Sequence, residues 1–310
     1  MRGILTHHHI HIPGAVLQAY AQAKLLNAEI IDYRFDHIEQ WQNTNKKRSM
    51  VYQGFVNKLP ISKRYIDDSF HKDYDMIIIG SDEVWKLSAG KYSKPWPNVF
   101  WGGDWDCETV AFSASANRLN IEKLTEEQKK EMKKKLSKFS LIGVRDGETK
   151  NFIESLGVKC IKTCDPTLVY NFPETELELK HKRAVGLYIN DGEYLDNCMK
   201  QVKGHVYSLY KKTKHTQTDL SALCPFDFIQ AIKQLGFVIT DSYHTAIFCL
   251  KFGVPFCATE NTKGKIYDLL ADLGVLHYYN STPREVLKVH KRVDLTTIQE
   301  TYREGMKCLV

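Results

Sequence analysis

The stretch VITDSYHTAIFCLKFGVPF, residues 238–256, decides the fold that this sequence predicts. Residues 237–239 form a short apolar run that is typical of a buried parallel strand, and apolar residues continue at helical spacing from Ala246. The polar turn Asp-Ser-Tyr-His at 241–244 lies between them. We therefore expect this turn at the carboxyl end of a strand, where open α/β sheets bind ligands and a helix N-terminus attracts anions.

Apolar strands and helices alternate along the rest of the chain, which predicts an α/β protein. The polar segment 171–183 contains Pro173 and is typical of a linker. We expect two Rossmann-like βα domains that face each other across a cleft: 1–172, 173–294, and a helix at 295–310 that packs back on the first domain. Residues 36–72 are polar and are expected to form one or two exposed helices over a sheet edge, and residues 275–279 a short strand.

Composition and charge narrow the class of protein. The chain has 310 residues, 43% of them hydrophobic and 26% charged, without an apolar run long enough to span a membrane. Its formal net charge of +6 favours anionic substrates or a weak hold on a membrane surface, and solvated lysines explain it equally well. Eight cysteines without a C-x-x-C pattern, and an N-terminus unlike a signal peptide, indicate a cytoplasmic protein. The lysines are not interleaved with aromatic residues, so no nucleic-acid partner is expected.

Three further polar turns follow predicted strands: GSDEVW at 80–85, GVRDGET at 143–149 and CDPTLVY at 164–170. Asp82 and Arg145 are the reactive side chains of the first two turns. Each also has a purely structural interpretation, because Asp82 can cap a helix and Arg145 can pair with a nearby carboxylate.

Tryptophan and histidine clusters supply further candidates. Trp85 and three other tryptophans fall within 85–105, where they either stack on a sugar ring or anchor the loop in the core. Four histidines occupy positions 7, 8, 9 and 11. Alternate residues of a strand face opposite ways and no partner ligands are evident, so we expect no metal site here. We expect one histidine, His8, to contact substrate.

Dinucleotide-binding, Walker A and G-x-S-x-G motifs are absent from the sequence. The polar turns, in their order and spacing, together with PGAVLQAYA at 13–21 and AFSASAN at 111–117, instead resemble the polysaccharide pyruvyl transferase family. The resemblance extends from residue 2 to about residue 260. It implies a GT-B-like fold and transfer of pyruvate from phosphoenolpyruvate onto two hydroxyls of a saccharide as a ketal, in cell-surface polysaccharide biosynthesis.

The resemblance also assigns roles to individual residues. Asp82 and His244 correspond to catalytic residues, and Arg145 to the arginine that binds the donor. Ser242 and Tyr243 stand where some members have Arg-Leu, so Lys263 or Lys265 is expected to replace the missing cation. Substrate contacts are further expected from Ser81, Trp85, His8 and Gly14; before Gly14 the family's Asn-Tyr is replaced by Ile12-Pro13.

The expected partners are phosphoenolpyruvate, as co-substrate, and a saccharide acceptor, nucleotide- or lipid-linked. No other cofactor and no metal are expected, and the inner face of the membrane is a compatible location. Two alternatives stay open: a GT-B glycosyltransferase that uses a nucleotide-sugar, and a non-catalytic saccharide-binding member of the family.

Overall fold

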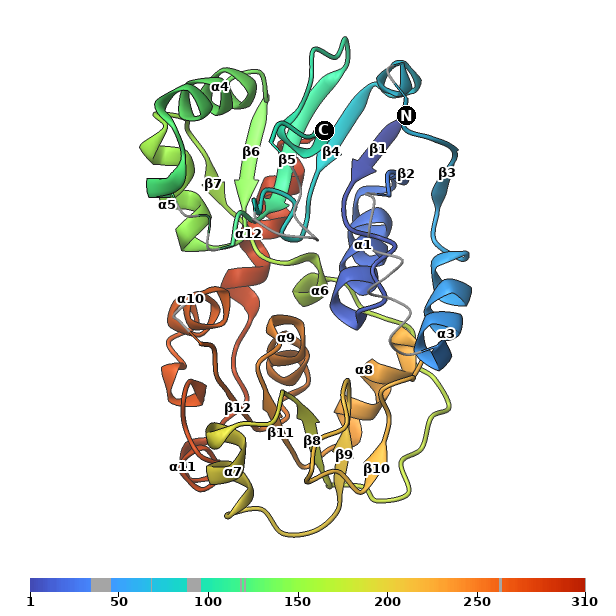
Figure 1. Ribbon diagram of the computed structural model, residues 1–310, viewed down its shortest axis with the longest axis vertical. Helices are drawn as coiled ribbons and strands as arrows, with labels where there is room; N and C mark the ends of the chain where they lie inside the picture. The colour runs from blue at the N-terminus through green and yellow to red at the C-terminus, as the bar shows by residue number, and fades with distance from the viewer. Residues whose placement is uncertain are drawn as a thin grey trace. The chain divides into compact units, whose positions relative to one another are not determined.

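The computed structural model describes residues 1–34, 46–67, 69–87, 96–117, 119, 121–261 and 264–309 (Figure 1). The chain forms two compact units. Unit 1 comprises 1–44, 56–170 and 297–310, and unit 2 comprises 45–55 and 171–296. Each unit contains one parallel β-sheet with helices packed against it.

Unit 1 has a seven-stranded sheet in the order β3-β2-β1-β4-β5-β6-β7, in which every neighbouring pair is parallel. This is the doubly wound order, in which the chain starts in the middle and winds outward in both directions. The strands are β1 (Arg2–Leu5), β2 (Glu29–Asp32), β3 (Ile61–Tyr65), β4 (Met76–Ile79), β5 (Glu108–Ala114), β6 (Leu141–Val144) and β7 (Ile161–Lys162). The helices are α1 (Pro13–Leu26), α4 (Glu126–Leu136), α5 (Gly147–Ser155), α6 (Pro166–Val169) and α12 (Thr296–Lys307), with 3-10 turns η1 (Phe70–Asp73), η2 (Val99–Trp101) and η3 (Ile121–Lys123).

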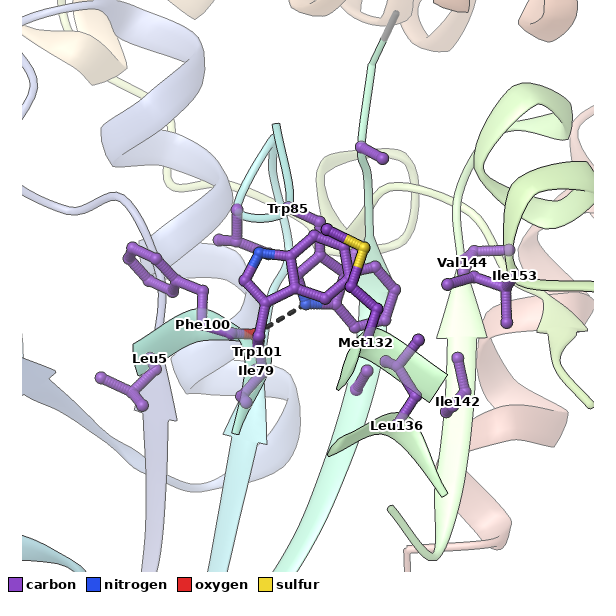
Figure 2. Close-up of a cluster of buried hydrophobic side chains, with 14 of the residues drawn as sticks. Leu5, Ile79, Trp85, Phe100, Trp101, Met132, Leu136, Ile142, Val144 and Ile153 are labelled. Atoms are coloured by element: carbon purple, nitrogen blue, oxygen red, sulfur yellow. Dashed lines mark hydrogen bonds between the residues drawn. The ribbon is translucent and has the colours of Figure 1, made fainter. Parts of the chain in front are cut away.

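One face of this sheet carries the main hydrophobic cluster of unit 1 (Figure 2). Ile79 and Val144 from the strands meet Met132 of α4 and Ile153 of α5 there. The helices supply these residues because their apolar positions recur along one face while the lysines of α4 stay in solvent. The strands are apolar on both faces, as expected of a parallel sheet that is covered on both sides.

The other face of the sheet receives α12, from the far end of the sequence. Tyr302 is completely buried and its ring packs edge-on against Phe112 of β5, 4.8 Å between centroids. Gly305 lets the helix approach this closely, because a Cβ there would lie 2.7 Å from the Phe112 ring. A side-chain nitrogen of Arg2 donates to the carbonyl of Leu309 at 2.7 Å. These contacts join the first strand and the last helix within unit 1.

Unit 2 has a five-stranded parallel sheet in the order β10-β9-β8-β11-β12. Its two central strands lie side by side and are wholly buried. The strands are β8 (Val185–Tyr188), β9 (Val206–Ser208), β10 (Thr218–Asp219), β11 (Phe237–Thr240) and β12 (Phe256–Ala258). The helices are α3 (Lys46–Val56), α7 (Glu193–Met199), α8 (Pro225–Gln234), α9 (Tyr243–Phe252), α10 (Lys265–Asp272) and α11 (Pro283–Val289), with the 3-10 turn η4 (Leu276–Tyr278).

Residues 36–72 differ most from the sequence prediction. Where they are described, they form α3 and the edge strand β3 rather than exposed helices alone. Residues 45–55, expected in the first domain, belong to unit 2. The reason is a set of specific contacts: Arg48 donates to the carbonyls of Ser221 and Tyr210, and Phe55 packs on Phe226 at 5.0 Å.

Smaller differences concern short elements in unit 2. Residues 276–278 form the 3-10 turn η4, where a strand was expected, and only a single bridge joins Tyr279 to Ala258. Pro283 then starts α11, a helix that the sequence analysis did not predict.

Tyr302 provides a test of how far unit 1 depends on α12. Tyr302→Ala should lower the free energy of unfolding by about 3–5 kcal/mol, because it leaves a cavity beside Phe112. Tyr302→Phe is the matched control. The Tyr302 hydroxyl is buried and has no hydrogen-bond partner within the part of the chain that is described, so its removal should leave stability unchanged or higher. Urea unfolding curves measure both, and equal losses in the two variants would contradict this packing.

Candidate functional site

The carboxyl ends of strands β1, β4, β6 and β7 of unit 1 bring four polar side chains together. Arg145, directly after β6, donates to Asp82 Oδ1 at 3.0 Å and to Asp165 Oδ2 at 2.7 Å. Asp82 Oδ2 lies 3.3 Å from Nδ1 of His7, which follows β1. All four residues are buried. The sequence analysis singled out Asp82 and Arg145 at strand ends; the structure places them in direct contact.

Backbone contacts fix the position of Asp82. Its peptide pairs with Ala114 as an isolated bridge, and its carbonyl accepts a hydrogen bond from the N–H of Ser115 at 2.9 Å. The N–H of Arg145 in turn donates to the carbonyl of Ala114 at 3.1 Å. Asp82 has a left-handed backbone with φ of 73°, a conformation in which aspartate is tolerated better than most residues. The ends of β4, β5 and β6 therefore hold the aspartate and the arginine in register.

Two buried glutamines of α1 hold the neighbouring turns. The Gln18 side-chain amide donates to Thr6 Oγ1 at 3.0 Å and to the carbonyl of His7 at 2.9 Å. The Ser81 hydroxyl donates to Gln18 Oε1, and the Ser81 N–H to Gln22 Oε1 at 2.8 Å. The helix after β1 thus positions the backbone on both sides of the His7–Asp82 pair. Neither glutamine was selected from the sequence, although Gln18 lies in the quoted motif at 13–21.

Arg145 does not have the position expected of a donor-binding residue. Its side chain is completely buried, and two carboxylates already accept from its two terminal nitrogens. The structural interpretation that the sequence left open, pairing with a nearby carboxylate, is the one observed. Asp165 was missed as a partner because it lies twenty residues further along the chain. It sits beside Arg145 because β7 lies next to β6 in the sheet.

We call His7, Asp82, Arg145 and Asp165 the strand-end cluster. His7, rather than His8, is its histidine. His8 is completely buried and its Nε2 lies 3.2 Å from Asp32 Oδ1, so the prediction that His8 contacts substrate is not supported. Burial raises the pKa of Asp32, but hydrogen bonds from His8 and Arg34 outweigh it and hold the pKa below its usual value. The two adjacent histidines thus contact different aspartates.

Burial, followed by repulsion from His8, lowers the pKa of His9 to about 2. Within the described parts of the chain, no group of three or more His, Cys, Asp or Glu side chains is arranged to hold a metal ion.

In unit 2, the turn at 241–244 lies where the sequence predicted it, between β11 and α9. Ser242 is the N-cap of α9, and its hydroxyl accepts from the N–H of Thr245 at 3.4 Å. Tyr243 and His244 are buried in the first helical turn, with their rings 5.4 Å apart. Lys265 Nζ lies 5.5 Å from the centre of the Tyr243 ring. A lysine therefore lies beside the first residue of α9.

Asp241, which precedes the cap, differs from a typical surface carboxylate. Burial raises the pKa of Asp241, and hydrogen bonds from Asn190 offset only part of this effect. The Asn190 amide lies 3.3 Å from Asp241 Oδ2, and the N–H of Asp241 donates to the carbonyl of Tyr188. The turn is thus fixed at Asp241 to the neighbouring strand β8 and at Ser242 to its own helix.

The remaining predicted contacts have structural roles. Trp85 is completely buried, stacks on Trp101 at 5.4 Å, and donates from Nε1 to the carbonyl of Phe100 at 2.6 Å (Figure 2). It cannot present a ring face to a sugar, so anchoring is its role. Ser81 and Gly14 are likewise buried. Lys263 lies outside the described residues.

Comparison with known proteins assigns the chain to a family. A profile of the polysaccharide pyruvyl transferase family matches residues 13–263, most of the chain. The chain belongs to this family. The match confirms the resemblance drawn from the motif order, and it identifies a family of saccharide-modifying transferases of polysaccharide biosynthesis. No curated protein sequence matches the chain.

The chain is also similar to several solved structures. UDP-N-acetylglucosamine 2-epimerase from Rickettsia bellii aligns with a TM-score of 0.52 at 8% identity, over 99% of this chain and 93% of that one. Sucrose-phosphate synthase from Thermosynechococcus elongatus aligns with a TM-score of 0.48 at 10% identity, over 99% and 94%. The glycosyltransferase SnogD from Streptomyces nogalater gives 0.43 at 10%, over 100% and 94%.

The similarity to the epimerase, with two parallel sheets, confirms the predicted GT-B-like α/β fold. Among the described residues, no helix is long and apolar enough to cross a membrane.

Arg145 tests whether the strand-end cluster is held by charge. Arg145→Met should lower the free energy of unfolding by about 3–5 kcal/mol, because Asp82 and Asp165 lose the cation between them while buried. The exposed Arg303, on α12, is the matched control, and Arg303→Met should change stability by less than about 0.5 kcal/mol. Urea unfolding at neutral pH measures both. A loss below about 1 kcal/mol in Arg145→Met would show that the cluster does not depend on this ion pair.

Proposed function

We propose that this protein transfers the pyruvyl group of phosphoenolpyruvate to two hydroxyls of a saccharide, forming a ketal. The observation that carries the proposal is the buried chain of contacts from Asp165 through Arg145 and Asp82 to His7. Such an arrangement suits removal of a proton from a hydroxyl, because Asp82 can orient the His7 ring and stabilise its protonated form.

The reaction requires proton transfers and no redox step. The oxygen of one sugar hydroxyl bonds to C2 of phosphoenolpyruvate, while C3 accepts a proton and becomes a methyl group. The second hydroxyl oxygen then bonds to C2 as the bond to phosphate breaks. One hydroxyl proton balances the new methyl group, and the other leaves with inorganic phosphate.

His7 is the proposed base toward the sugar hydroxyl. When Nδ1 donates to Asp82, Nε2 is the ring atom that can accept a proton. Arg145 does not bind substrate in this scheme. It holds the Asp82 carboxylate in place, so that the aspartate can stabilise the imidazolium.

The residues of unit 2 that we propose for the donor are Ser242, His244 and Lys265. Phosphoenolpyruvate carries a phosphate and a carboxylate, and both are favoured by a helix N-terminus with a nearby cation. Lys265 supplies that cation beside Tyr243, and so takes the place of the arginine that some family members have at the position of Ser242. His244 is the proposed acid for C3 or for the leaving phosphate.

Donor identity is the first test of this function. Phosphoenolpyruvate should raise the melting temperature of the protein, whereas a nucleotide-sugar such as UDP-N-acetylglucosamine should not. Stabilisation by the nucleotide-sugar alone would favour a glycosyltransferase, and stabilisation by neither would favour a non-catalytic role.

His7→Asn tests the proposed base. Asparagine keeps an N–H donor near the position of Nδ1 but cannot accept the hydroxyl proton, so turnover should fall by about 10²-fold or more. The matched control is His8→Gln, which should affect stability more than turnover per folded molecule. Phosphate release from phosphoenolpyruvate with an acceptor measures turnover. Normal turnover in His7→Asn, together with a loss of turnover in His8→Gln, would overturn the assignment.

His244→Gln tests the residue in unit 2. Turnover should drop by about 10²-fold or more if the side chain acts as an acid, while the melting temperature should hardly change. His181, an exposed histidine of the same unit, is the control, and His181→Gln should retain turnover. If His244→Gln melts earlier yet turns over normally per folded molecule, then His244 only fills the wall of the turn.

A further inference from the structure

Unit 1 contains a pocket that the reaction scheme above does not use. Its volume is about 530 Å³, within the range of small-molecule sites. It lies between η1, the segment after η2, and α4, and its lining includes Tyr33, Phe70, His71, Asn98, Trp105 and Lys135.

One aromatic ring separates this pocket from the His7–Asp82 pair. Phe100 is completely buried, and its ring lies 5.5 Å from the ring of His7 and 5.4 Å from the ring of Tyr33. Tyr33 follows β2 directly and lines the pocket. The pocket therefore begins close to the strand ends where we place the reacting hydroxyl, and leads away from them.

The pocket walls combine aromatic faces with a buried polar atom. Trp105 is partly exposed, and it packs edge-on against Phe70 at 5.3 Å. Gly103 makes room for the indole, because a Cβ there would lie 2.4 Å from Trp105 Nε1. The His71 side chain lines the pocket although the residue is only 7% exposed. Its Nδ1 has no hydrogen-bond partner within the described residues, which is costly unless a ligand or water supplies one.

The pocket lining carries the two carboxylates of Asp67 and Asp104 and the ammonium group of Lys135, so it is not a positively charged surface. Lys135 donates to the carbonyl of Gly102 at 3.2 Å, and Asp104 pairs with Lys138. An anion such as phosphoenolpyruvate therefore gains little there. Sugar rings have apolar C–H faces and many hydroxyls, and they suit aromatic walls with a few fixed polar atoms.

We propose that this pocket is a second saccharide subsite, which binds a sugar unit of an oligosaccharide acceptor next to the unit that reacts. The inference rests on the proposed function only in treating the bound saccharide as the acceptor of the reaction. Binding of a saccharide by Trp105 and His71 does not depend on that function. The predicted ligand is an uncharged sugar unit.

The experiment uses a printed array of oligosaccharides of two to six units, each immobilised at its reducing end, and the full-length protein. The wild type should bind a subset of the printed oligosaccharides. Trp105→Ala should weaken that binding at least about tenfold, as truncation of a central aromatic contact does. Tyr20→Ala is the matched control, because Tyr20 is a partly exposed aromatic residue of α1 outside the pocket, and it should bind as the wild type does.

A second variant separates loss of ligand from loss of fold. His71→Leu removes the polar atom in a similar volume, so it should weaken binding while the melting temperature stays equal or rises. Absence of binding by the wild type, or equal binding by Trp105→Ala and Tyr20→Ala, overturns the proposal.

Measuring phosphate release distinguishes a failure of the subsite proposal from a failure of the proposed function. With an oligosaccharide acceptor, Trp105→Ala should raise KM about tenfold and leave kcat unchanged, because the contact is the same in ground and transition states. Array binding that depends on Trp105, without any turnover of phosphoenolpyruvate, would reject the function and keep the subsite. Turnover with an unchanged KM would reject the subsite alone.

Discussion

Arg145, buried between Asp82 and Asp165, is the interaction on which the geometry of the strand ends depends. A buried guanidinium loses its hydration, and only well-placed carboxylates compensate for that loss. Each terminal nitrogen here has its own aspartate, and the three side chains come from the ends of β4, β6 and β7. The pairing therefore fixes the spacing of strand ends in the sheet, and Asp82 can meet His7 only within that spacing. The same pairing occupies both terminal nitrogens of Arg145.

Much of this fold follows from the sequence, because buried parallel strands are nearly continuous apolar runs. The runs at β4 and β11 and the polar turns after them predicted the α/β alternation and the placing of Asp82 and Ser242. The structure of residues 46–65 was harder to predict, because this mostly polar segment has no clear helical or strand periodicity although it forms both a helix and a strand. Arg48 and Phe55 place α3 on unit 2 through partners more than 160 residues away, and no local pattern records such contacts.

The candidate site was predicted at the level of turns rather than of side chains. The choice between His7 and His8 depends on which way each ring faces, and four histidines in five positions give no periodicity to decide it. Trp85 shows the same limit, since a tryptophan beside a polar turn suits a sugar or a core equally until its burial is known. Asp165 could have been suspected from its turn, but its pairing with Arg145 follows from the order of the strands.

The return of α12 to unit 1 has a consequence for the order in which the protein is made. Domains generally fold as they leave the ribosome, the N-terminal one first. Here the pieces of unit 2, residues 45–55 and 171–296, are complete before residues 297–310 are synthesised. The face of the first sheet that Tyr302 covers stays open until then, although most of its strands emerged long before. The unit that starts the chain is therefore the second to be finished, and the ring of Phe112 lacks its Tyr302 partner until the last residues of α12 have been made.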